Sequence, residues 1–139
     1  PPGGPLDQNL GARPTAASKH CHRPQVGART RQDLAHPVNV VANPRLSRVL
    51  GSATVLVNSM HHQGIKQLAP TRIANAFAPD GLIEGVESND ENFVLGVQWQ
   101  PEDLADLDPN MRRLFDAFIE AAGSYDDKPA RVISTLRSA

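Results

Sequence analysis

The sequence predicts an α/β fold whose later half contains an antiparallel three-stranded meander followed by an amphipathic helix. Apolar and polar residues alternate over 82–87, directly after the hairpin signal Asp80-Gly81. A second apolar run, 93–99, follows a polar turn at 88–92, and Pro101 prevents further strand pairing. From residue 108 the apolar residues recur with a helical period. We therefore expect residues 72–99 to form the meander and the helix to follow it.

The segments before the meander are less regular. Residues 1–37 are rich in Pro, Gly, Arg and His and show no apolar period, so we expect loop with at most short structured pieces. A short strand is predicted over 38–41, and a short helix over 44–51 closes at Gly51. The apolar content of a second strand, 54–58, is continuous, which predicts burial on both of its faces.

The final helix has the strongest sequence signals. Asp108 is its predicted N-cap, and Pro109 occupies the first helical position. One stripe before Gly123 contains Met111, Leu114, Phe115, Phe118, Ile119 and Ala122. Residues 124–139 lack such a stripe and are predicted to form a tail or a loosely docked last helix.

Composition limits the classes of protein that fit. A chain of 139 residues with 40% apolar content can bury one core. Thirteen of the fifteen Asp and Glu residues follow residue 50, whereas the Lys and Arg residues divide evenly around it. The arginines of the basic half are scattered and no aromatic residue lies between them, so nucleic-acid binding is not expected. Since one cysteine allows no intrachain disulfide and no apolar run could span a membrane, we expect a cytoplasmic protein without membrane contact.

Three stretches resemble the signatures of one family, in the same order. They are Asn58-Ser59-Met60-His61-His62-Gln63, then Asp80-Gly81-Leu82-Ile83-Glu84-Gly85-Val86-Glu87, then Gly96-Val97-Gln98-Trp99-Gln100-Pro101-Glu102. The chain is therefore similar to the γ-glutamyl-γ-aminobutyrate hydrolases, a peptidase C26-like branch of the class I glutamine amidotransferase-like superfamily. A weaker match over 3–10 extends the resemblance to about residues 3–122.

The resemblance implies a fold and a domain organisation. The fold would be the carboxyl-terminal part of a flavodoxin-like three-layer sandwich, with the meander and the last helix included. Residues 1–37 would continue a truncated domain, 38–123 would form the carboxyl-terminal part of the amidotransferase-like domain, and 124–139 would be a tail. The chain would then begin just after the turn that carries the family's nucleophilic cysteine. We accordingly expect either a missing amino-terminal half as partner or self-association through uncovered apolar faces.

The resemblance also assigns a site and a substrate class. In the family a Cys-His-Glu triad hydrolyses small-molecule γ-glutamyl amines at C–N bonds other than peptide bonds, without a cofactor. Glu102 matches the acid of the triad, but Gln100 occupies the position of the histidine. A primary amide has no useful basicity, so Gln100 cannot transfer the proton. The resemblance further places the substrate-binding rim at Ser59, His61, His62 and Gln63.

Two functions follow, from different classes. One is a γ-glutamyl amide hydrolase whose activity is absent from these residues alone. The alternative is a degenerate, non-catalytic homologue that serves as a binding or interaction module.

Cys21 admits two further interpretations that the sequence does not favour. His20 and His22 flank it, but no strand, small-residue elbow or helix is present to expose a thiolate nucleophile. The segment His20-Cys21-His22 together with His36 offers zinc-type ligands, but their spacing matches no common zinc site. An ordinary loop cysteine and no metal are expected.

Overall fold

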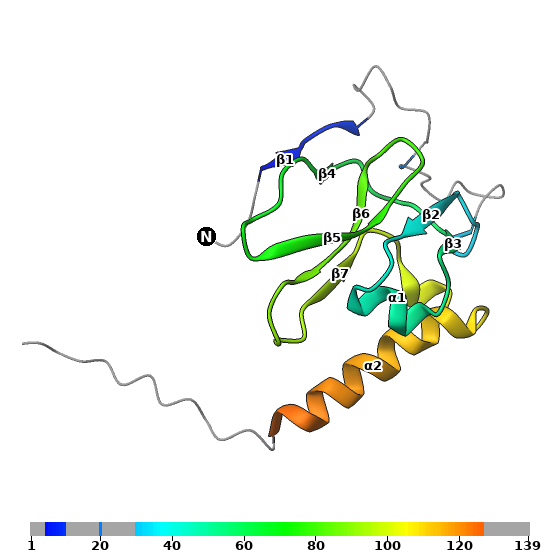
Figure 1. Cartoon of the computed structure of the whole chain (residues 1–139). Helices are drawn as coiled ribbons and strands as arrows, with labels where there is room; N and C mark the ends of the chain where they lie inside the picture. The colour runs from blue at the N-terminus through cyan, green and yellow to red at the C-terminus, as the bar shows by residue number, and fades with distance from the viewer. Residues whose placement is uncertain (1–4, 11–19, 21–29, 127–139) are drawn as a thin grey trace, which may run out of the picture.

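The computed structural model describes residues 5–10, 20 and 30–126. Within this part of the chain one antiparallel layer of strands packs against two helices (Figure 1). The seven-stranded sheet has the order β1-β4-β6-β5-β2-β3, with β7 paired to β6, and the described pairs are antiparallel. The elements are β1 (Leu6–Asp7), β2 (His36–Val40), α1 (Arg45–Leu50), β3 (Thr54–Val57), β4 (Gly64–Ile65), β5 (Arg72–Phe77), β6 (Ile83–Ser88), β7 (Leu95–Val97), the 3-10 helix η2 (Pro101–Asp103) and α2 (Pro109–Asp126).

The predicted meander is confirmed in β5, β6 and β7. β5 pairs with β6 through a turn at Asp80-Gly81, where the Ala78 N–H donates to the Leu82 carbonyl at 2.9 Å. Gly81 has a φ of 81°, a left-handed backbone angle that residues other than glycine rarely adopt. β6 continues into β7 with Gly85 opposite Val97, so the chain returns along β6 and reaches Trp99 just past the strand end.

The short helix and its neighbouring strands also form, with one correction. α1 ends at Gly51, whose φ of 66° and N–H bond to the Ser47 carbonyl give the expected C-cap. The prediction that the 54–58 strand is buried on both faces is wrong. In β3, Val55 and Val57 are buried whereas Leu56 is 53% exposed. β3 pairs with β2, which leaves the outward side chains of the strand without a covering layer among the described residues.

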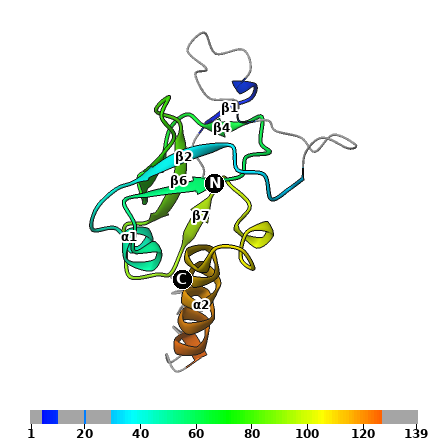
Figure 2. The same cartoon turned by 90° about the vertical axis from the view of Figure 1, so that its right-hand side faces the viewer.

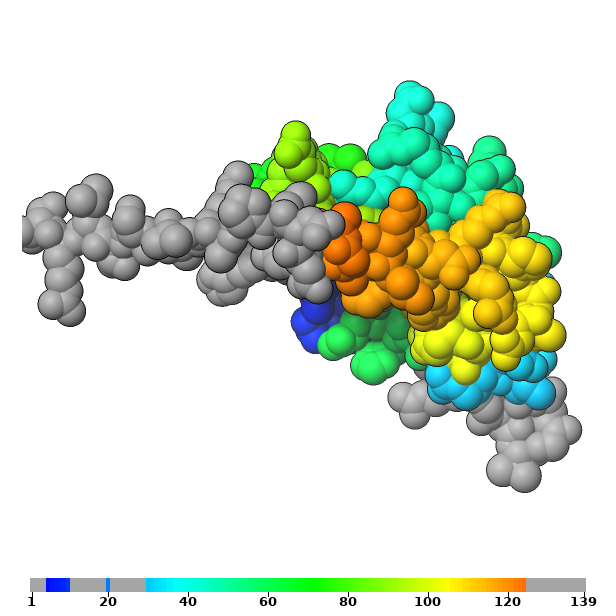
Figure 3. Space-filling model, turned by 90° about the horizontal axis from the view of Figure 1, so that it is seen from below, coloured from blue at the N-terminus to red at the C-terminus, as the bar shows by residue number. Residues whose placement is uncertain are grey.

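The last helix begins as predicted and ends later. The Asn110 N–H donates to the Asp108 carboxylate at 2.8 Å, which makes Asp108 the N-cap. α2 passes Gly123 and runs to Asp126, and the tail beyond it lies outside the described residues. Only the first two residues of the apolar stripe are buried. These are Met111 and Leu114, whereas Phe118 and Ile119 are 60% and 67% exposed. Figure 3 shows α2 lying across the surface.

One aliphatic core holds these elements together. α1 and α2 lie on the same side of the strands, as Figure 2 shows, and pack against each other there. The buried core consists of Val38, Val40, Leu46, Leu50, Val55, Val57, Ala76, Trp99, Leu104, Met111 and Leu114. A smaller cluster of Leu10, Ala78 and Leu82 anchors the start of the chain, and β1 adds an edge strand there. No described helix is long and apolar enough to cross a membrane.

Candidate functional site

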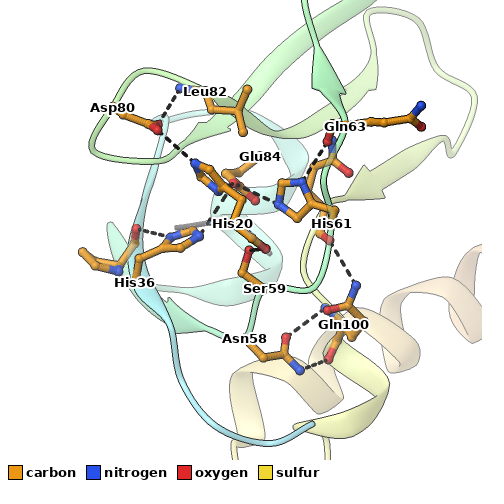
Figure 4. Close-up of polar contacts among 12 residues, drawn as sticks. His20, His36, Asn58, Ser59, His61, Gln63, Asp80, Leu82, Glu84 and Gln100 are labelled. Carbon is orange, nitrogen blue, oxygen red and sulfur yellow. Dashed lines mark hydrogen bonds and ion pairs between the residues drawn. The ribbon is translucent and has the colours of Figure 1, made fainter. Parts of the chain in front are cut away.

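Gln100 lies where the sequence predicted, just after the strand end. Its backbone is held by Asn58, which follows β3. The Gln100 N–H donates to Asn58 Oδ1 at 2.9 Å, and Asn58 Nδ2 donates back to the Gln100 carbonyl at 3.1 Å (Figure 4). The Gln100 side chain donates to the Gln98 carbonyl at 3.4 Å, and its Oε1 is buried without a hydrogen bond from a described residue. The position is therefore fixed, but its amide side chain is not basic enough to accept a proton.

Glu102 is not part of this hydrogen-bonded arrangement. It lies in η2, its side chain is 58% exposed, and its carboxylate is 4.0 Å from the Arg31 guanidinium. Arg31 makes the closer contact with Asp103, at 2.8 Å. No hydrogen bond connects Gln100 and Glu102 within the described residues. The strand end therefore presents the two residues of the sequence match without the contact through which a carboxylate would orient a base.

The four predicted rim residues divide into one structural residue and three that line a hollow. Ser59 is fully buried and donates to the His20 carbonyl at 2.6 Å. His61, His62 and Gln63 line a hollow of about 480 Å³, with Glu84, Val97 and Gln98 on another side of it. Gln100 and Glu102 are not among its lining residues. The hollow and the triad position are thus separate features of this part of the chain.

A cluster of histidines around Glu84 was not predicted. Glu84 is fully buried on β6, and its Oε1 lies 3.2 Å from His20 Nδ1, 3.5 Å from His61 Nε2 and 3.8 Å from His36 Nε2 (Figure 4). The four residues come from segments up to 64 positions apart, so sequence spacing could not have found them. The one available signal was a glutamate in the middle of a predicted strand, because an ionised carboxylate that is buried at such a place needs partners.

Charge inside this cluster is reflected in two shifted pKa values. Burial alone would raise the pKa of Glu84, but the contacts with His20 and His61 outweigh it and lower that pKa. Burial likewise opposes charge on His20, yet Glu84 on one side and Asp80 on the other raise its pKa. The cluster therefore favours a negative carboxylate with positive charge beside it.

Glu87, the other acid of the same sequence motif, has a structural role. Its carboxylate accepts hydrogen bonds from the Arg45 and Leu46 N–H groups at 2.8 and 3.0 Å, which lie at the start of α1. Asn75 Nδ2 donates to it at 2.8 Å. Burial alone would raise the pKa of Glu87, but these donors lower it. Glu87 thus holds α1 against the sheet.

Of the four residues considered as zinc-type ligands around Cys21, the structure describes His20 and His36. Cys21 and His22 lie outside the described residues. His20 and His36, by contrast, do come together, with ring centroids 5.0 Å apart. Donor atoms of His20, His36 and Glu84 all lie within 4.8 Å of one another.

The chain is similar to known proteins along most of its length. The family model described as peptidase C26 matches residues 2–102. Protein NtpR of Enterococcus hirae is 41% identical over 119 residues, covering 85% of this chain and 48% of that protein. Gamma-glutamyl-gamma-aminobutyrate hydrolase PuuD of Escherichia coli is 35% identical over 120 residues, covering 86% of this chain and 47% of that protein. The chain therefore spans about half the length of these relatives.

A solved structure gives a weaker comparison. A glutamine amidotransferase from Thermotoga maritima aligns with a TM-score of 0.42 and 16% identity, over 68% of this chain and 37% of that one. A score this low carries no argument, and the family assignment rests on the sequence matches.

Proposed function

The chain belongs to the peptidase C26 family, and we propose that it forms the carboxyl-terminal side of a γ-glutamyl amide hydrolase site that lacks its general base. The observation that carries this proposal is Gln100. Its backbone is fixed by two hydrogen bonds with Asn58 at the end of the meander. By the resemblance of the surrounding motif, its amide occupies the position of the family's histidine. The predicted consequence is that these residues alone do not hydrolyse γ-glutamyl amides.

The chemistry explains why one substitution matters so much. In the family reaction a thiolate attacks the γ-carbonyl carbon, the C–N bond breaks, the amine leaves with a proton, and water then cleaves the thioester. One group must remove the thiol proton and return it to the amine, which requires a pKa near neutrality. Gln100 can donate or accept a hydrogen bond but cannot carry that proton. Loss of a positioned general base costs about 10²–10⁴-fold in rate.

The substrate class follows from the family. A relative with 35% identity is named for hydrolysis of gamma-glutamyl-gamma-aminobutyrate, so a small γ-glutamyl amine is the proposed ligand class. His61, His62 and Gln63 are the proposed substrate contacts, because they line the hollow of about 480 Å³. The nucleophile is proposed to come from a segment that corresponds to the amino-terminal half of the relatives, because this chain resembles the carboxyl-terminal portion of the family and covers 47% of the E. coli protein.

The alternative is a non-catalytic module that binds a ligand without turnover. It is favoured by the separation of the hollow from Gln100 and Glu102, because the lining residues do not depend on the triad position. Isothermal titration of γ-glutamyl-γ-aminobutyrate into the chain tests whether it binds this ligand, and absence of binding excludes the module. Because both candidates predict no amine release from the isolated chain, the complementation experiment below is what distinguishes them.

The hydrolase proposal is tested by complementation. Amine release is measured for the unmodified chain and for Gln100→His, each with and without the amino-terminal half of a related hydrolase, after co-purification confirms assembly. We expect activity only in the assembled Gln100→His sample, at least about 10²-fold above the assembled unmodified chain. Activity of the unmodified complex would show that another group acts as base. An inactive Gln100→His complex would show that Glu102 cannot orient a histidine from its exposed position.

A further inference from the structure

The three histidines around Glu84 share one hydrogen-bonding pattern, which indicates where their protons lie. Each ring has one nitrogen facing Glu84 and one facing outward (Figure 4). The outward nitrogens lie 3.0 Å from the Pro37 carbonyl for His36 and 2.9 Å from the Gln63 carbonyl for His61. Carbonyl oxygens only accept hydrogen bonds, so these two outward nitrogens carry the protons. A neutral ring with its proton on the outward nitrogen turns the lone pair of its other nitrogen toward Glu84.

His20 follows the same pattern with a stronger partner. Its outward Nε2 lies 2.9 Å from Asp80 Oδ2, and its inward Nδ1 faces Glu84. Histidines that ligate metals almost always donate their second ring N–H to a carboxylate or a backbone carbonyl, which fixes the ring and its tautomer. All three rings have such a partner. The acceptors therefore orient three inward nitrogens onto one carboxylate.

This arrangement favours a cation at its centre. In the described part of the chain, the three inward nitrogens and both Glu84 carboxylate oxygens make no hydrogen bond of normal geometry. Glu84 is fully buried and the side chain of His20 is 3% exposed, so water does not screen the charge and the lone pairs. A proton on His20 would satisfy one inward nitrogen and leave the other two facing an anion. A metal ion among the donors satisfies several of them together.

The two distances from histidine nitrogens to Glu84 Oε1 fit a small divalent ion. With bonds of about 2.0–2.1 Å, neighbouring ligand atoms of a tetrahedral zinc site are about 3.3 Å apart. The His20 Nδ1 and His36 Nε2 atoms lie 3.2 and 3.8 Å from Glu84 Oε1, on either side of that separation. Imidazole and carboxylate together suit zinc and neighbouring transition metals, whereas calcium and magnesium prefer oxygen ligands alone.

We propose that His20, His36 and Glu84 bind one zinc-like divalent ion, with His61 beside the fourth coordination position. His61 and Glu84 both line the hollow of about 480 Å³, so that fourth position faces a space that a small ligand can enter. Two histidines and one glutamate with an open fourth position are a donor set typical of catalytic zinc sites. The site is distinct from the Gln100 position and does not depend on the proposed hydrolase function.

The direct test is cobalt substitution in the full 139-residue chain. The protein is freed of metal with a chelator, dialysed, and titrated with Co²⁺ while visible absorption is recorded. We expect the intense d–d bands of a four-coordinate site to saturate at one equivalent, and one equivalent of Zn²⁺ to abolish them. The proposal would be overturned if no saturable bands appeared and equilibrium dialysis showed no retention of Zn²⁺. The charge of Glu84 would then be compensated by protonated histidine alone.

Variants identify the ligands. We expect His36→Gln and Glu84→Gln to weaken Zn²⁺ binding by at least 10–100-fold, the loss that even outer-shell partners of a metal site cause. His62→Gln is the matched control, because His62 is exposed next to His61 and belongs to no contact of the cluster. Cys21→Ser removes the one thiol of the chain and should also retain binding. Equal affinities for His36→Gln and His62→Gln, or loss of binding in Cys21→Ser, would overturn the ligand assignment.

Folding of the variants can be followed through Trp99. It is the one tryptophan of the chain and is 2% exposed, so its fluorescence reports an intact core. If Glu84→Gln or His36→Gln does not fold, the cobalt titration of the unmodified chain decides the question by itself.

Discussion

Two buried carboxylates on β6 lie three residues apart and have opposite surroundings. Glu87 receives three N–H donors at 2.8 to 3.0 Å, two from the start of α1 and one from Asn75. Glu84 faces three imidazole nitrogens at 3.2 to 3.8 Å, each in a ring whose other nitrogen is already engaged. A buried charge is tolerated when fixed donors replace water. Glu87 has those donors within the fold, whereas Glu84 acquires its compensation from a cation.

Among the variants that test this difference between the two carboxylates, Glu87→Gln is expected to lower the free energy of unfolding the most. The new amide would place an NH₂ group against the N–H donors of Arg45 and Leu46, so at least one donor at the start of α1 would lose its acceptor. Hydrogen bonds to a charged group contribute about 1.5–3 kcal/mol, and we expect the free energy of unfolding to fall by about that amount. Urea denaturation followed by Trp99 fluorescence measures it.

Glu91→Gln is the control for that change. Glu91 is an exposed acid in the turn between β6 and β7, and its neutralisation should alter the free energy of unfolding by less than about 0.5 kcal/mol. Equal losses in the two variants would mean that net charge, and not the α1 contact, accounts for the effect.

A smaller effect is expected from acid. The donors hold the pKa of Glu87 below its ordinary value of 4.5, so its contribution to stability is fully present above pH 4.5. As the pH falls below that value, the unfolded chain takes up the proton first, and the contribution is lost through the lower folded-state pKa. Denaturation curves between pH 6 and pH 3 should therefore converge for the unmodified chain and Glu87→Gln. Curves that stay parallel would contradict the assignment.

Much of the fold could be predicted because its signals are local. The meander follows from alternation and the Asp80-Gly81 turn, and the start of α2 follows from Asp108 and Pro109. The prediction for β3 failed because continuous apolar sequence does not reveal whether a second layer covers the strand, and Leu56 remains exposed. Phe118 and Ile119 continue the predicted apolar stripe of α2, but periodicity likewise does not reveal whether another layer covers them, and both are exposed.

The candidate site likewise contains one part that local sequence signals predict and one part that they do not. Gln100 could be located from the sequence, because a strand end and Pro101 mark it locally. The Glu84 cluster could not, because His20, His36 and His61 are brought to β6 only by tertiary pairing of distant segments. The sequence spacing of His20 and His36 matches no common zinc site. The fold nevertheless brings donor atoms of both residues close to the Glu84 carboxylate.

The most direct test of the different roles of the two carboxylates is the change in melting temperature on adding zinc to metal-free protein. At free zinc about 100-fold above the dissociation constant, binding stabilises the folded state by about 2.7 kcal/mol, which raises the melting temperature of a domain of this size by several degrees. We predict that Glu87→Gln melts lower than the unmodified chain yet keeps this rise in full, whereas Glu84→Gln loses it. An equal rise in both variants, or no rise in the unmodified chain, would contradict the account.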